Sequence, residues 1–190
     1  PNQQVVSLEG KWNMYWQQLL SPADLPAEGG VLVDFPKKWT STQIDGQYLP
    51  ATGYASYELR VLLPPGSKGL GLNMPDVYTS YRLYVNGKLL QANGEPGTSA
   101  ETTKPYWLGR TFALPEGADT LHLLLQIANF HHSKGGPYKN LTIGNYTEML
   151  NERKRDSALD LVMSGALLMG GLFFFGLYLF GKYDKAMLFF

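Results

Sequence analysis

The sequence predicts an all-β sandwich or barrel followed by a membrane-spanning helix, and three observations support this prediction. Glycine and proline recur every 8 to 15 residues over the first 145 positions, with short β-like runs between them. No helical periodicity is sustained before residue 145. The stretch 161–181 carries no charge, and as a helix rising about 1.5 Å per residue it would span roughly 30 Å, the thickness of a bilayer's hydrocarbon core.

Alternation of apolar and polar residues predicts the individual strands. In 10–19, Trp12 and Trp16 alternate with polar positions, so we expect both, like Trp39, to lie in the core. Asn86-Gly87 between apolar runs predicts a hairpin with a two-residue type I′ turn. The run 120–130 is strongly apolar, which favours a central position in a sheet. The predicted strands cover residues 10–19, 31–35, 55–63, 70–74, 81–85, 88–91, 110–114, 120–130 and 141–143.

The charge balance of the first 150 residues excludes one class of partner. They hold 11 Lys and Arg against 12 Asp and Glu, so this part is nearly neutral. Nucleic-acid binding needs a basic surface, so we expect no nucleic-acid partner. The length suffices for one hydrophobic core and one domain, and the chain has no cysteine and hence no disulfide.

The sequence changes character at Asn145, which with Glu148 three residues later resembles a helix-capping box. Residues 145–160 contain no glycine or proline, which predicts a helix running into the apolar stretch; a plain tether is the alternative. The predicted organisation is therefore a β-sandwich sensor domain at 1–145, a juxtamembrane linker helix at 146–160 and a transmembrane helix at 161–181. Residues 182–190 are expected to form a short loop and the start of a second membrane helix.

The apolar stretch contains four glycines: Gly165, Gly170, Gly171 and Gly176. Small residues let membrane helices approach closely, so we interpret these positions as packing sites for further transmembrane helices of the same protein. Glycine is also generally common in membrane helices, which is the simpler interpretation.

Five motifs occur in a fixed order: LEGKW, GYASYELRVLLP, MPDVYTSYRLYVNGKLL, NGEPGTSAET and a run ending in QIANFHHSKGG. Together with the basic stalk and apolar span they resemble the bacterial receptors with seven transmembrane helices and diverse intracellular signalling modules, from about Val5 to Phe190. The resemblance implies an extracellular jelly-roll head, galactose-binding-like in fold, and the first membrane helix. It also implies binding of a carbohydrate or another small molecule, and later helices that lead to a kinase, cyclase or phosphatase module.

Two signals disagree on which side of the membrane the head lies. Arg153, Lys154 and Arg155 precede the apolar stretch and only Lys182 and Lys185 follow it, which by the positive-inside rule places the head in the cytoplasm. A cleaved signal peptide would place it outside. The resemblance favours the outside, so we expect a bacterial inner-membrane protein with residues 1–150 in the periplasm and lipid around the helix.

Sugar binding needs aromatic faces for stacking and planar polar groups for hydroxyls. Residues of both types gather at predicted strand ends and along the long polar loop 93–105, where they would line one concave face. The alternative is that Tyr81 and Trp107 belong to the core, and that Asp76 and Asn129 only hold loops. The predicted ligand-binding residues are Asp76, Tyr78, Tyr81, Asn93, Glu95, Tyr106, Trp107, Asn129, His131 and His132.

Other functions find less support in the sequence. Adjacent residues such as His131 and His132 point to opposite sides of an extended chain, so we predict no metal site and no cofactor, although a structural calcium ion at Asp76 is an alternative. Neither a recognisable carboxylate pair nor a catalytic motif is present, so we predict no enzyme activity in this chain. An interaction or homodimerisation module, or the accessory domain of a carbohydrate-active enzyme, are the remaining alternatives.

Overall fold

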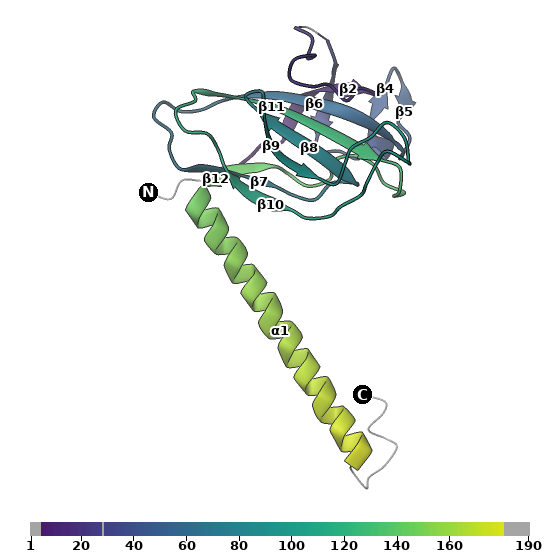
Figure 1. Ribbon diagram of the computed structural model, residues 1–190, viewed down its shortest axis with the longest axis vertical. Coiled ribbons are helices and arrows are strands. Elements are labelled where there is room, and N and C mark those ends of the chain that lie inside the picture. The colour runs from purple at the N-terminus through teal and green to yellow at the C-terminus, as the bar shows by residue number, and fades with distance from the viewer. Residues whose placement is uncertain (1–4, 28, 181–190) are drawn as a thin grey trace. The chain divides into compact units, whose positions relative to one another are not determined.

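The computed structural model describes residues 5–27 and 29–180, and over these ranges it contains two large antiparallel sheets and one two-stranded ladder (Figure 1). The larger sheet has six strands in the order β3-β2-β6-β11-β8-β9. Their bounds are Val31–Phe35 for β3, Gly10–Trp16 for β2, Gly53–Leu62 for β6, Thr120–Asn129 for β11, Ser80–Val85 for β8 and Lys88–Asn93 for β9. The strand β11 lies inside this sheet, between β6 and β8, as its apolar sequence predicted.

The smaller sheet has four strands in the order β1-β12-β7-β10. They are β1 (Val6–Ser7), β12 (Thr142–Asn145), β7 (Leu70–Met74) and β10 (Arg110–Ala113). In Figure 1 the strands β7, β10 and β12 lie below those of the larger sheet, so the two sheets form a sandwich. This confirms the predicted fold class, a β-sandwich followed by one long apolar helix.

The core lies between the sheets because alternate residues of each strand point inward. On β11, Leu121, Leu123, Leu125 and Ile127 are fully buried within it. The prediction that the tryptophans lie in the core is confirmed for Trp12 and Trp39, which are buried. Trp16 is only partly buried and packs against the core.

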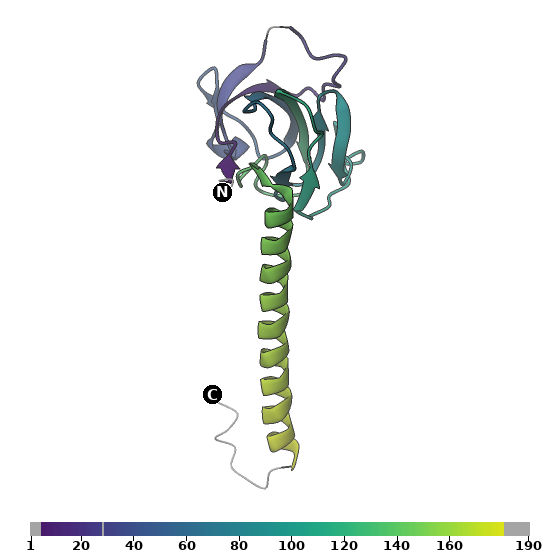
Figure 2. The same cartoon turned by 90° about the vertical axis from the view of Figure 1, so that its left-hand side faces the viewer.

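The outward face of the larger sheet is also covered over part of its area. Gln126 Nε2 donates to the carbonyl of Leu20 (2.8 Å), and Ser56 Oγ donates to the carbonyl of Gln18 (2.8 Å). These bonds hold residues 18–20 against the sheet, and both views show the purple segment 17–27 on the side away from the smaller sheet (Figures 1 and 2). Consequently Ser56 and Gln126 are buried, although they alternate with core residues.

Local turn chemistry agrees with the sequence in one place and departs from it in another. Asn86 and Gly87 both adopt positive φ (48° and 79°), which confirms the type I′ turn between β8 and β9. Residues 41–52, where no strand was predicted, contain the end of a 3₁₀ turn (Trp39–Ser41) and a small ladder of β4 (Gln43–Ile44) and β5 (Gln47–Tyr48). Two-residue strands carry no measurable alternation, so the sequence could not reveal them.

The helix α1 extends without interruption from Tyr146 to Phe180. Asn145 Oδ1 accepts a hydrogen bond from the backbone N–H of Glu148 (3.1 Å), which confirms the predicted N-cap. The chain forms two compact units, 1–149 and 150–190, so the first turn of α1 belongs to the head. Within the described ranges α1 is the one helix long and apolar enough to cross a membrane, and its most apolar part is not buried. Gly181 and the predicted second helix at 182–190 lie outside the described residues.

Candidate functional site

Four aromatic rings from three loops meet at one place in the head, and we call them the aromatic cluster: Tyr78, Trp107, His132 and Tyr138. Tyr78 stacks on His132 (ring centroids 4.4 Å apart, planes at 9°) and on Tyr138 (4.4 Å, 19°). Trp107 meets Tyr78 edge to face at 5.7 Å and lies 5.5 Å from His132. Both faces of Tyr78 are therefore occupied, because two parallel rings cannot share one face. Trp107, at 51% exposure, is the ring of the cluster most open to solvent.

A carboxylate and an ammonium group border the aromatic cluster. Asp76 accepts hydrogen bonds from the Tyr138 hydroxyl and from Lys139 Nζ, the latter at 2.7 Å. Partial burial raises the pKa of Asp76, but the two hydrogen bonds and the charge of Lys139 outweigh it and hold the pKa below its usual value. The hydrogen bond from Lys139 to Asp76 raises the pKa of that lysine. The pair is therefore ionised at neutral pH.

Asn129 shapes the loop that carries His132. Its side chain is fully buried at the end of β11. Nδ2 donates to the carbonyls of Ala51 (2.7 Å), His132 (2.8 Å) and Lys134 (3.2 Å), and Oδ1 accepts from the His132 N–H (3.1 Å). Asn129 thus positions the site instead of offering its amide to a ligand.

The same loop rests on the core through two glycines. Trp39 donates its backbone N–H to the Gly135 carbonyl (3.0 Å), and its ring lies so close to Gly135 and Gly136 that a Cβ at either position would collide with it. Tyr78 in turn donates its N–H to the Gly136 carbonyl (3.4 Å). The aromatic cluster is therefore built on a tightly packed base.

The structure brings together four of the ten predicted site residues: Asp76, Tyr78, Trp107 and His132. Tyr81 is fully buried in the core, so it offers no surface to a ligand and we leave it out of the candidate site. Asn93 is buried and donates to the Leu108 carbonyl (3.0 Å), which gives it a role in loop structure. The contribution of the retained residues to binding stays a prediction.

The three remaining predicted residues lie on exposed surface. Glu95 pairs with Lys104 (2.9 Å), His131 Nε2 lies 3.1 Å from the Thr103 carbonyl, and Tyr106 is 55% exposed. The sequence prediction missed Tyr138 and Lys139, which end the glycine-rich loop after β11. Their types, an aromatic residue beside a cation in a loop, are the signal that would have included them.

The candidate site offers no evident metal position. Among residues 5–27 and 29–180 there is no group of three or more His, Asp or Glu side chains that could hold a metal ion. Asp76, the ligand in the alternative of a calcium ion, accepts hydrogen bonds from Tyr138 and Lys139. The arrangement can stack on a flat apolar face and exchange hydrogen bonds with hydroxyl groups.

We expect the Asp76–Lys139 pair to make the stability of the head depend on pH in the acidic range. The folded-state pKa of Asp76 lies below the unfolded value of about 3.9, so its contribution is present above that pH and is lost as the pH falls through the folded-state pKa. Below about pH 4 the free energy of unfolding should therefore fall less steeply with pH in Asp76→Asn than in the wild type. Urea unfolding midpoints at a series of pH values measure this. Glu116→Gln, at an exposed position, is the control and should keep the wild-type profile; identical profiles for Asp76→Asn and wild type would contradict the assignment.

Comparison with solved structures identifies the class of the fold. A β-glucuronidase from an uncultured Clostridium sp. matches with a TM-score of 0.57 and 16% identity over 75% of this chain and 29% of its own. The Ruminococcus gnavus β-glucuronidase matches at 0.54 and 13%, over 75% and 28%, and a protein named as a β-galactosidase from Bacteroides fragilis at 0.53 and 17%, over 75% and 23%. No protein-family profile and no curated sequence matches this chain.

The head thus has a galactose-binding-like β-sandwich fold, which it shares with one part of these enzymes. At these identities the likeness concerns the fold alone. The chain spans less than a third of the length of each of these enzymes, and in addition it carries the long apolar helix α1.

Proposed function

We propose that this chain is the periplasmic ligand-sensing head and the first membrane helix of a bacterial inner-membrane receptor. The observation that carries the proposal is the direct connection of a sandwich strand to α1. Asn145 ends β12 and caps α1, and the N–H of Tyr146 donates to the Gly69 carbonyl (2.9 Å). A Cβ at Gly71 would come within 2.9 Å of Tyr146, so β7 packs tightly against the start of the helix. Movement of β7 or β12 would therefore be passed to α1.

The aromatic cluster supports a carbohydrate or a similar small molecule as the ligand. Trp107 offers an exposed ring for stacking on a sugar face, and Asp76, Lys139 and His132 supply hydrogen-bonding groups at its border. The resemblance to the sugar-binding domain of β-glucuronidases agrees with this ligand class. In the proposed receptor, lipid surrounds α1 and further helices of the same protein pack against it.

We infer that the head binds its ligand without converting it. The four candidate carboxylates are each engaged with their own partners: Glu58 with Tyr15 and His122, Asp76 with Tyr138 and Lys139, Glu95 with Lys104, and Glu101 with Ser99. A glycosidase needs one carboxyl group free to donate a proton and a second placed about 5 to 10 Å away across the substrate.

Trp107→Ala should weaken sugar binding by about two- to twelvefold, because it removes the stacking surface, which contributes about 0.5–1.5 kcal/mol. The measurement is the thermal shift of the full chain, in a detergent without sugar head groups, against a panel of neutral and acidic sugars. Tyr48→Ala removes an even more exposed aromatic ring on β5 (67% against 51%) and serves as the control. The absence of a shift with every sugar, or equal binding by Trp107→Ala, would refute this assignment of the site.

A second function is favoured by the structural comparisons themselves. In the similar proteins this type of sandwich is one part of a glycosidase, so the head is alternatively the accessory domain of a membrane-anchored carbohydrate-active enzyme. The two functions differ in whether the ligand changes the state of α1, as a receptor requires and an accessory domain does not.

A further inference from the structure

A second cluster of polar side chains lies on the outward face of the larger sheet and centres on Glu58. Among the residues that the structure describes, Glu58 is the one buried side chain with a formal charge (7% exposed). It stands on β6 and pairs across the sheet with Asn13 of β2. Alternation along β6 places it on the face opposite the core residues Ala55 and Tyr57. Burial of a carboxylate is costly unless hydrogen bonds compensate for it.

Three side chains compensate for the burial of Glu58. The Tyr15 hydroxyl donates to Oε2 (3.1 Å), His122 Nε2 lies 2.7 Å from Oε1, and Arg60 Nε lies 3.7 Å from Oε1. Burial and the hydrogen bond to Glu58 raise the pKa of Tyr15, so its hydroxyl remains a donor at neutral pH. A carboxylate has about four acceptor positions, and these contacts leave acceptor capacity for a ligand.

Two glycines that follow the segment 17–27 fix the position of Tyr15. Gly29 and Gly30 have φ of +136° and +82°, a region that favours glycine. A Cβ at Gly30 would come within 3.1 Å of Tyr15 Cζ, so the backbone there passes directly over the ring. This close approach holds the Tyr15 hydroxyl on Glu58 and forms one wall of a hollow.

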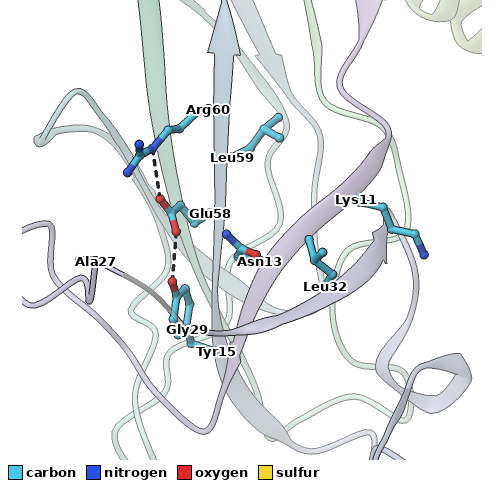
Figure 3. A pocket seen from close by; sticks show the side chains of 9 residues that line it. All are labelled: Lys11, Asn13, Tyr15, Ala27, Gly29, Leu32, Glu58, Leu59 and Arg60. Atoms are coloured by element: carbon cyan, nitrogen blue, oxygen red, sulfur yellow. Dashed lines mark hydrogen bonds and ion pairs between the residues drawn. The ribbon is translucent and has the colours of Figure 1, made fainter.

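The hollow is a pocket of about 350 Å³ next to Glu58. Figure 3 shows the Glu58 carboxylate between Tyr15 and Arg60, with Asn13 and Leu32 on one side and Ala27 and Gly29 on the other. Its size is at the small end of the range for ligand pockets, about 300–1,000 Å³, which suits one sugar ring better than a longer chain. The pocket shares no residue with the aromatic cluster.

Among the residues that the structure describes at the pocket, the charges are paired, and this restricts the ligand. Glu58 faces Arg60, and Lys11 at the rim is paired with Asp34 (2.6 Å). An ionic ligand would leave one charge without a partner. Glu58 can accept further hydrogen bonds from a ligand, Arg60 can donate them, and the Asn13 amide can do both. Hydroxyl groups donate and accept at once, so a neutral polyol satisfies all three.

We propose that the Glu58 pocket is a second binding site, separate from the aromatic cluster, for one neutral polyhydroxylated molecule of monosaccharide size. Glu58 accepts hydrogen bonds from its hydroxyl groups, Asn13 and Arg60 bind neighbouring oxygens, and Leu32 covers an apolar edge. This site rests on the proposed function in one respect, the ligand class, and adds a location and a charge preference.

The test titrates glucose and galactose, with glucuronate and glucosamine as charged counterparts, into the full chain in a non-glycosidic detergent by calorimetry. The background is Trp107→Ala, which removes the stacking surface of the aromatic cluster. We expect a neutral sugar still to bind, and to bind at least tenfold more weakly when either Leu32→Trp or Glu58→Gln is added. Leu32 is 65% exposed, so Leu32→Trp fills the pocket without touching the Glu58 hydrogen bonds and remains informative even where Glu58→Gln does not fold.

Leu62→Trp is the matched control, since Leu62 on β6 is likewise an exposed strand leucine (81%) but does not line the Glu58 pocket. It should leave the affinity unchanged. Binding that disappears in Trp107→Ala overturns the second site and leaves the proposed function standing. Binding that persists in Trp107→Ala but is unchanged by Leu32→Trp also overturns the second site. Tighter binding of a charged sugar overturns the preference of this site for neutral ligands. No binding to the wild type overturns both proposals.

Discussion

Replacing Trp39 with alanine will destabilise the head by about 3–5 kcal/mol, the usual cost of removing a buried tryptophan. Trp39 is fully buried, its Nε1 donates to the Tyr57 hydroxyl (2.7 Å), and its ring meets Trp16 edge to face at 5.0 Å. The substitution therefore opens a cavity and also leaves the buried Tyr57 hydroxyl without that donor. Domains of this size are stable by about 5–15 kcal/mol, so much of the total would be lost.

The loss should extend to the candidate site because Gly135 and Gly136 rest on the Trp39 ring. Pulse proteolysis in urea reads the folded fraction without depending on tryptophan fluorescence, and the midpoint should fall by more than about 1 M. Trp107→Ala removes the same side chain from a half-exposed position and should change the midpoint little. If both variants lose equal stability, Trp39 does not support the loop in the way we describe.

The sequence identified those parts of the fold that short-range rules determine. Asn86-Gly87 specifies a turn because two positive φ values in succession exclude most residues. The apolar run of β11 specifies a strand with both faces covered. The position of Glu58 could not be foreseen in this way. Its alternation with Tyr57 predicts an exposed face, and it is buried because Tyr15, His122 and the segment up to Gly30 converge there from distant parts of the chain.

The candidate site was predictable by residue type but not by geometry. Asp76, Tyr78, Trp107 and His132 were selected because they are aromatic or polar residues at strand ends, and the sandwich brings those ends together. The same rule also selected Tyr81, which is the first residue of β8 whose side chain points into the core and which is buried. A one-residue difference along a strand reverses the direction of a side chain, and only the register determines it.

Two arginines in the apolar part of α1 should prevent it from crossing a membrane. Each arginine near a membrane centre costs about 2.5–3.5 kcal/mol on insertion scales, so Leu168→Arg with Leu172→Arg should cost about 5–7 kcal/mol. Both leucines are more than half exposed in α1, so no protein core compensates for the change. The wild-type chain should remain in the membrane pellet after alkaline carbonate extraction and the double variant should not. Leu159→Arg, in the charged part of the same helix, should behave as wild type.

The same preparation reports the side on which the head lies. The chain has no cysteine, so Glu116→Cys introduces a unique thiol in an exposed turn of the head. With the head in the periplasm, a membrane-impermeant maleimide should label this thiol in cells whose outer membrane has been opened, before the inner membrane is broken. Labelling only after lysis would mean that Arg153, Lys154 and Arg155 determine orientation as the positive-inside rule states, and that α1 carries a head exposed to the cytoplasm. A wild-type chain released by carbonate would instead show that α1 packs against protein partners, because nothing else would cover so large an apolar surface.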